Sequence, residues 1–214
     1  MFRFARRSST ATLIVLLAAR AVLLTPVRRA DAAGCSVSNV GTAAIFGVLQ
    51  GAVDVATEGD TLRIKGTCVG TTMIRFTSLH LRGVPTAAQP TPTLDGRGLG
   101  RALRLSEARV VILDLTITHG KAKYGGGIRL SYSRLSLKGD TTIAGNTAGM
   151  EGGEIYLSTD CLLALEDSVT VTGNTAGTVG GGVRNTTGTV SVCSDLVAIS
   201  PNDPDDPPAT LTCT

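Results

Sequence analysis

Apolar and polar residues alternate along short runs over most of this chain. Leu135 and Leu137 flank a serine, and Ile155 and Leu157 flank a tyrosine, with glycine, asparagine, aspartate or serine between one run and the next. Alternation with a period of two places successive side chains on opposite faces of a β-strand. The pattern therefore predicts an all-β chain of short strands.

These strand patterns recur at a nearly constant spacing. The sequence TTIAGNTAG at 141–149 returns as VTVTGNTAG at 169–177 and loosely as VAISPNDPD at 197–205, so that Asn146, Asn174 and Asn202 are 28 residues apart. The glycine-led strands GGGIRL, GGEIYL and GGGVRN begin at positions 125, 152 and 180 and keep this period within one residue. Two independent landmarks with one period indicate a repeat fold.

Each repeat of about 27–28 residues contains three strand patterns, for example at 128–130, 135–137 and 141–144. A unit of this size cannot bury its apolar face alone, so it must stack on its neighbours. We therefore predict a right-handed parallel β-helix with three strands per coil, whose coils lie about 4.8 Å apart. Antiparallel hairpins in a sandwich would use the same strands but would not explain the constant spacing.

Glycines and asparagines are predicted at the corners between strands. Glycine permits positive φ, and asparagine tolerates left-handed backbone and can hydrogen-bond to copies of itself in neighbouring coils. We interpret Asn146, Asn174 and Asn202 as a structural ladder rather than as a binding site. The predicted corner glycines are Gly125, Gly126, Gly152, Gly153, Gly180 and Gly181.

Both ends of the chain depart from the repeat. Apolar residues on one helical face between positions 43 and 56, followed by Gly59, predict an α-helix that caps the open end of the stack. The proline-rich segment at 200–209 cannot continue the strand pattern. We expect an N-terminal segment with its capping helix at 33–62, coils at 63–200 and an exit segment at 201–214.

Residues 1–32 have the features of a signal peptide: a basic start, an apolar run over 11–24 and small residues near 30–32. Arg20 interrupts the apolar run, which is shorter than the roughly 20 residues of a spanning helix. We therefore expect a protein exported to the periplasm, the cell surface or the medium, without a stable transmembrane span.

Removal of this segment changes the charge of the protein. The segment holds six arginines and one aspartate, so the remainder has 14 basic and 16 acidic side chains, against 20 and 17 in the whole chain. The remainder is slightly acidic and has no cluster of lysine and arginine along its sequence. We therefore expect no nucleic-acid partner.

Five cysteines in an exported chain predict disulfides, because none forms a C-x-x-C pair and both histidines lie far from them. We predict that Cys35 bonds to Cys68 and ties down the N-terminal cap. We also predict a bond between Cys193 and Cys213, which leaves Cys161 free.

Cys35 has a second interpretation as the acylated cysteine of a lipobox, AAGC at 32–35. Acylation would hold the protein on a membrane. Ala32 stands where a larger aliphatic residue is usual, and two arginines at 28–29 separate Cys35 from the apolar run. We therefore favour the disulfide.

A family resemblance follows from EGDTLRIKGTC at 58–68, LTITHGKAKYGGGI at 115–128 and the coils with GNTAG and GGGV. These segments resemble the right-handed parallel β-helix repeat proteins exported by bacteria, over residues 35–202. The GG-x-I/V elements are similar to repeats of polymorphic outer-membrane proteins. Pectate-lyase-like enzymes share this architecture, so the resemblance implies the fold but leaves the function open.

Catalysis on such a scaffold requires clustered acids. Lyases hold Ca²⁺ with several carboxylates, and hydrolases use close aspartates. Asp114 and His119 are the catalytic candidates, and Glu151 and Glu154 could approach them on one face, although no spacing requires it. Asp95, in LDGRG, is interpreted as a turn residue. We expect no metal and no cofactor.

Two classes of function remain. We favour a non-enzymatic, adhesive or ligand-binding β-helix protein that binds an extracellular glycan or a surface protein. The alternative is a polysaccharide-active lyase or hydrolase with its acids gathered in one groove. The outward side chains proposed for binding are Arg129, Tyr132, Arg134, Tyr156 and Arg184.

Overall fold

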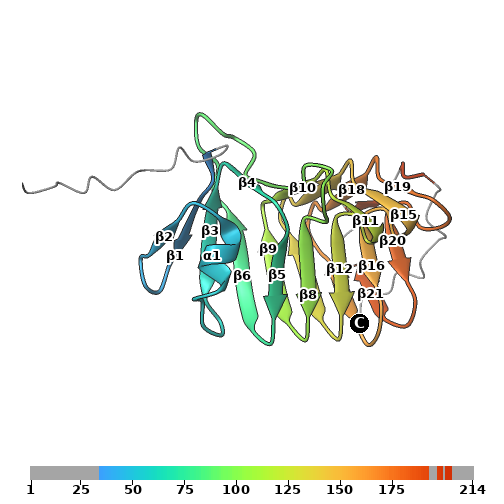
Figure 1. The fold of residues 1–214 in the computed structure, drawn as a ribbon, viewed down its shortest axis with the longest axis horizontal. Coiled ribbons are helices and arrows are strands. Elements are labelled where there is room, and N and C mark those ends of the chain that lie inside the picture. The colour runs from blue at the N-terminus through green and yellow to red at the C-terminus, as the bar shows by residue number, and fades with distance from the viewer. Residues whose placement is uncertain (1–33, 193–196, 200, 204–214) are drawn as a thin grey trace, which may run out of the picture.

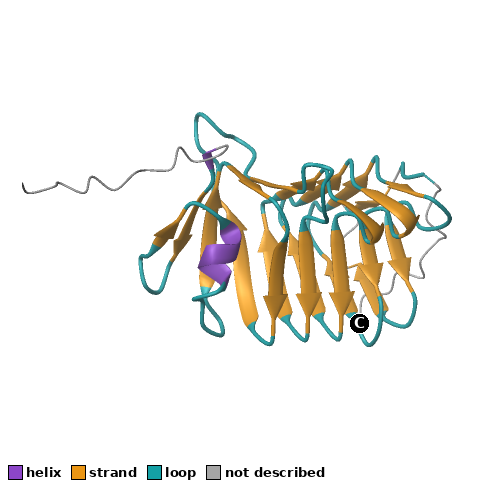
Figure 2. Cartoon of the chain, in the orientation of Figure 1, coloured by secondary structure: helices purple, strands orange, loops and turns teal. Residues whose placement is uncertain are grey.

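The computed structural model describes residues 34–192, 197–199 and 201–203. Over these residues the chain winds into a parallel β-solenoid of about five turns with almost no helix (Figures 1 and 2). Strands from successive turns lie side by side and form extended sheets along the stack. The predicted all-β parallel β-helix is therefore confirmed.

The strands of the described residues form four sheets, named A to D here. Sheet A contains β1 (Ser36–Asn39), β2 (Ile45–Phe46), β3 (Thr61–Lys65), β6 (Ser78–Gly83), β9 (Arg109–Leu113), β13 (Arg134–Lys138), β17 (Leu162–Leu165) and β21 (Thr189–Val192). Sheet B contains β4 (Thr67–Val69), β7 (Thr93–Asp95), β10 (Thr116–Thr118), β14 (Thr142–Ala144), β18 (Thr170–Thr172) and β22 (Ala198–Ile199). Sheet C contains β5 (Thr72–Arg75), β8 (Leu103–Ser106), β12 (Ile128–Ser131), β16 (Ile155–Leu157) and β20 (Val183–Asn185). Sheet D contains β11 (Lys121–Tyr124), β15 (Thr147–Glu151) and β19 (Thr175–Ala176).

Sheet D is an addition to the three strands predicted per coil. It lies between sheets B and C in the chain, at the corner that follows the asparagines. The corner segments are extended and pair in parallel with the same segments of neighbouring coils, for example Lys121 with Thr147 and Thr147 with Thr175. Corner segments that stack in register can thus form a short sheet of their own.

The core is built from columns of inward side chains. In sheet A the register stacks Leu79 on Val110, then Leu135, then Leu163, and all four are buried. Burial of each such aliphatic side chain stabilises the folded state by about 1.5–3 kcal/mol relative to leaving it exposed. The alternation seen in the sequence therefore becomes one continuous apolar core along the stack.

The predicted N-terminal capping helix is not confirmed. Helix α1 spans only Leu49–Val53, whereas β1 and β2 form an antiparallel hairpin that extends sheet A beyond β3. Ala43 has a φ of 57°, which breaks a helix, and backbone pairing places the residues at 45–46 in a strand. Helix α1 still buries Leu49 and Ala52 in the core.

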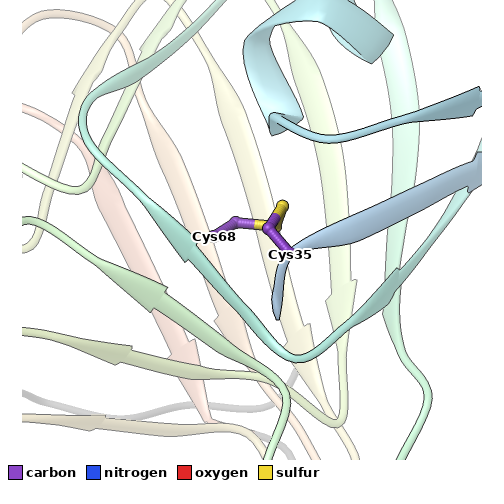
Figure 3. Close-up of a disulfide and its surroundings, with 2 residues drawn as sticks. All are labelled: Cys35 and Cys68. Atoms are coloured by element: carbon purple, nitrogen blue, oxygen red, sulfur yellow. A yellow bond between two sulfur atoms is a disulfide. The ribbon is translucent and has the colours of Figure 1, made fainter. Parts of the chain in front are cut away.

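Cys35 and Cys68 form the predicted disulfide, with an S–S distance of 1.99 Å (Figure 3). The bond joins the residue before β1 to β4. A Cys35 engaged in this bond has no free thiol for acylation, which favours the disulfide over the lipobox. Cys161 is buried and free, and burial raises the pKa of its thiol. The predicted bond between Cys193 and Cys213 lies outside the described residues.

The predicted signal peptide at 1–32 also lies outside the described residues. Within the described part of the chain, no helix has the length and apolar character that a membrane crossing requires.

Candidate functional site

The three ladder asparagines lie inside the corner that follows sheet B. Asn146 and Asn174 are each 1% exposed and Asn202 is 7% exposed. The side-chain oxygen of Asn174 accepts from the backbone N–H and Nδ2 of Asn146, at 2.9 and 3.1 Å. The side-chain oxygen of Asn202 accepts from the same two groups of Asn174, at 3.1 and 3.0 Å. These side chains therefore hydrogen-bond one coil to the next inside the protein.

Gly120 takes the place of the asparagine one coil earlier. Its N–H donates to Oδ1 of Asn146 at 2.8 Å. A Cβ at this position would collide with the carbonyl oxygen of Gly126 and lie 2.9 Å from Oδ1 of Asn146. The close approach of the two backbones explains why the earlier coil has glycine here.

The predicted corner glycines divide into two kinds. The first glycine of each pair has a positive φ, of 61°, 64° and 67° at Gly125, Gly152 and Gly180. All six glycines are buried. At the second glycines Gly126 and Gly153, a Cβ would collide with carbonyl oxygens of neighbouring segments.

The catalytic candidates Asp114 and His119 lie at opposite ends of β10. Asp114 follows β9, and its Oδ1 accepts from the backbone N–H of Asp140 at 3.2 Å. Nδ1 of the exposed His119 lies 3.2 Å from Oδ1 of Asp95. The structure thus pairs His119 with the aspartate that the sequence analysis assigned to a turn.

Glu151 and Glu154 form contacts within the fold. Oε2 of Glu151 accepts from Nε of Arg184 in the next coil at 2.9 Å. Glu154 is fully buried, and its Oε2 accepts from Nδ2 of Asn174 at 2.6 Å. The first carboxylate therefore supports the outer face of sheet C, and the second supports the asparagine ladder.

An open cleft of about 470 Å³ lies beside His119, lined by Asp95, Arg97, Lys121 and Thr147 among others. Asp95 supplies the carboxylate of this lining. A glycoside hydrolase uses a pair of carboxyl groups and a calcium site uses several oxygen ligands. Nowhere in the described residues do three or more histidine, cysteine, aspartate or glutamate residues gather as metal ligands.

The outward side chains of sheet C form a row that crosses the coils. The register places Met73, Arg104, Arg129, Tyr156 and Arg184 side by side on β5, β8, β12, β16 and β20. Neighbouring strands are about 4.8 Å apart, so each side chain can contact the next. We call these five residues the arginine–tyrosine row, and its strands face the viewer in Figure 1.

Aromatic rings extend this row into sheet D. The ring centroids of Tyr124 and Tyr156 are 5.2 Å apart. The guanidinium carbon of Arg129 lies 5.7 Å from the ring centroid of Tyr156, and Nζ of Lys123 lies 5.4 Å from that of Tyr124. Both distances suit cation–π contacts. The surface therefore combines ring faces with flanking cations.

Arg101, in the loop before β8, lies beside the row. Its Nη2 donates to the carbonyl oxygen of Tyr124 at 3.0 Å. Among the described residues, Nη1 of Arg101 and Nε of Arg129 are buried without a hydrogen-bond acceptor. Burial, followed by the like charges of Arg129 and Arg104, lowers the pKa of Arg101 to about 10.

The five outward residues predicted for binding lie on two faces. Arg129, Tyr156 and Arg184 belong to the row. Tyr132 lies in the corner directly after β12, and Arg134 begins β13 of sheet A; both line an open groove of about 490 Å³. The predicted set is therefore not a single surface.

Sequence reasoning missed Arg101, Arg104 and Tyr124. Arg104 pairs with Arg129 across an offset of 25 residues, which is shorter than the 28-residue period of the later coils. The signal that could have found Arg104 is the likeness of ALRL at 102–105 to GIRL at 127–130. Arg101 and Tyr124 lie in corner segments, where the pattern of apolar and polar residues does not predict which side chains point outward.

The fold and this surface define a parallel β-helix protein with a cationic and aromatic outer face. No family model matches the chain, and the comparisons with curated proteins and solved structures also give no match. The function is therefore inferred from the surface itself.

Proposed function

We propose that this chain is an exported β-helix protein that binds an extracellular glycan or a surface protein, without catalysis, through the outer face of sheet C. The observation that carries the proposal is the arginine–tyrosine row, in which the register gathers three guanidinium groups and the ring of Tyr156 on sheet C. We also propose kinship with the exported β-helix repeat proteins of bacteria, on the strength of the repeat motifs.

Export is supported by two independent features. The disulfide between Cys35 and Cys68 is typical of an oxidising compartment such as the periplasm or the cell exterior. The sequence at 1–32 has the order of charged, apolar and small residues found in signal peptides. Both features favour a surface-exposed or secreted protein.

Binding is supported by the chemistry of the row. Ring faces give rigid contact area at a low cost in conformational entropy, and arginine is enriched at the centres of interfaces. Tyr156 lies between Arg129 and Arg184 in register, so a ligand that crosses the coils meets a ring and a cation on neighbouring rungs. This arrangement suits a sugar chain or a polar protein surface.

A polysaccharide lyase or hydrolase is the second candidate. The contact between His119 and Asp95 at the edge of an open cleft favours it, because a carboxylate can orient a histidine that acts as a general base. The proposal of binding is preferred because, among the described residues that line this cleft, Asp95 is the one that carries a carboxylate.

One experiment separates the two candidates. The purified protein is passed over immobilised polysaccharides, with and without Ca²⁺, and both retention and product release are measured. We expect retention without cleavage. Replacement Tyr156→Ala should weaken binding about tenfold, which corresponds to about 1.4 kcal/mol. The matched control Tyr132→Ala, at the corner between sheets C and A and outside the row, should leave the affinity unchanged.

Release of products would contradict the binding proposal if His119→Ala or Asp95→Ala abolished the release and Tyr156→Ala left it intact. That result would establish an enzyme whose site lies at the cleft. Loss of retention in both tyrosine variants alike would contradict the assignment of binding to sheet C.

A further inference from the structure

The arginine–tyrosine row holds more positive charge than the fold neutralises. Within the described residues, Arg184 is the arginine of the row that has a carboxylate partner, Glu151. Arg104 and Arg129 are opposite one another in adjacent strands, and both lower the pKa of Arg101. Three half-buried guanidinium groups therefore lie close together, two on the adjacent strands β8 and β12 and one in the loop before β8.

Two donors of this cluster have no partner within the described part of the protein. Nη1 of Arg101 and Nε of Arg129 are buried, and neither donates a hydrogen bond to a described residue. A buried donor left unsatisfied is costly, and more so when it belongs to a charged group. These two nitrogens are enclosed, so a ligand from outside cannot reach them, but no acceptor of the described residues offsets the charge of their side chains. A negatively charged group from outside the chain would instead meet the half-exposed side chains of Arg101, Arg104 and Arg129.

We propose that Arg101, Arg104 and Arg129 bind a sulfate or phosphate ester group carried on a glycan. Such a group presents three terminal oxygens in different directions, so it can accept hydrogen bonds from guanidinium groups of two neighbouring coils at once. A carboxylate presents two oxygens in one plane and is matched by a single guanidinium fork. This inference rests on the proposed function and names the ligand class for the same surface.

The tyrosines beside the cluster fit the sugar that would carry the ester. Tyr156 is the register neighbour of Arg129, and its ring lies 5.2 Å from that of Tyr124. A sugar ring bonded to the ester can rest its apolar face on these rings. The ester group then sets the charge of the ligand and the tyrosines set its orientation.

General attraction to polyanions does not account for such binding. Without residues 1–32 the chain has 14 basic and 16 acidic side chains, so its net charge is slightly negative. Retention of a sulfated polymer must therefore come from a local cluster, and it should weaken as salt screens the charges.

The test uses three polymers with one backbone: dextran, carboxymethyl-dextran and dextran sulfate. We expect the purified protein to bind dextran sulfate at least tenfold more tightly than either of the others at equal ionic strength. Arg101→Gln and Arg129→Lys should each weaken that binding at least tenfold. Arg129→Lys keeps the charge and removes the guanidinium donors, so it tests geometry rather than charge.

The matched control is the double variant Arg63→Gln with Arg82→Gln. These exposed arginines are opposite one another on sheet A, so the variant loses twice the charge of Arg101→Gln far from the row. Its affinity for dextran sulfate should equal that of the native protein. Thermal unfolding of every variant checks the fold, and Arg129→Lys keeps the test decisive if Arg101→Gln does not fold.

Five results would contradict the proposal of an ester-bearing glycan. If the control variant weakened binding of dextran sulfate as much as Arg101→Gln does, the effect would be one of charge alone. If carboxymethyl-dextran bound as tightly as dextran sulfate, there would be no preference for esters. Equal retention of a single-stranded DNA oligonucleotide would remove the assignment to a glycan. If the protein binds neutral dextran, and this binding depends on Tyr156 but not on Arg101 or Arg129, the ester site is overturned and the proposed function is left intact. If no polysaccharide of the panel is retained, both proposals are contradicted.

Discussion

At the scale of single residues, buried asparagines connect the coils. Each side-chain oxygen of Asn174 and Asn202 accepts two hydrogen bonds from the preceding asparagine, and Nδ2 of Asn174 also reaches the carbonyl oxygen of Ile143 at 3.1 Å. Buried polar groups stabilise a fold when all of them are paired and destabilise it when one partner is lost. The ladder should therefore matter for stability and not for ligand binding.

Replacement Asn174→Ala tests this role. The change removes an acceptor used by Asn146 and a donor to Glu154, so the free energy of unfolding should fall by about 2–4 kcal/mol. Denaturant unfolding measures it. Ser136→Ala, at an outward position of β13, is the control and should change the free energy by no more than about 0.5 kcal/mol. A loss as small as that of the control would refute the structural role of the ladder.

At the scale of elements, the sequence predicts the strands of the coils better than the N-terminal segment that precedes them. The period-two alternation gives the strands of sheets A, B and C, because one face of each strand must be buried. The N-terminal capping helix is not confirmed beyond the short helix α1, because spacing alone cannot separate a helical face at 43–56 from a hairpin that pairs with β3. Tertiary pairing decides between the two, and Gly47, inside the predicted helical face, weakens the helix further.

The candidate site was predictable only in part. Arg129, Tyr156 and Arg184 are recognisable because they occupy the same place in successive glycine-led strands. Arg104 belongs to a shorter coil, and Arg101 approaches the row through a loop whose path no periodic pattern describes. The pairing of His119 with Asp95 likewise depends on the stacking of corners that are 24 residues apart.

The disulfide is the covalent link of the first coil, and its loss should destabilise that end of the stack. Cys35 and Cys68 are 33 residues apart, a loop for which the chain-entropy model gives about 3–4 kcal/mol. The double variant Cys35→Ala with Cys68→Ala should lose stability of this order in denaturant unfolding. Cys161→Ser should keep most of the native stability, since Cys161 forms no disulfide. Equal stability of the double variant and the native protein would show that the bond does not hold the cap.

At the scale of the whole molecule, stacking converts a spacing along the sequence into a surface. Residues about 25–28 positions apart become neighbours about 4.8 Å apart, so every outward position forms a row along the stack. The arginine–tyrosine row spans the coils of β5 to β20, and no single coil contains it. The proposed binding surface therefore depends on the register of the whole solenoid.

Cross-linking of cysteine pairs measures that register directly. In a Cys161→Ser background, Ser106→Cys and Ser131→Cys place thiols on opposite residues of β8 and β12, within the roughly 4.4–6.8 Å Cα separation that a disulfide allows. Arg75→Cys with Ser131→Cys places them two strands apart, at about 9–10 Å. After mild oxidation and digestion, mass spectrometry should detect the linked peptide for the first pair and not for the second. Linkage of the second pair at an equal or higher yield, or failure of the first to link, would contradict the stacked register on which both the fold and the proposed binding surface rest.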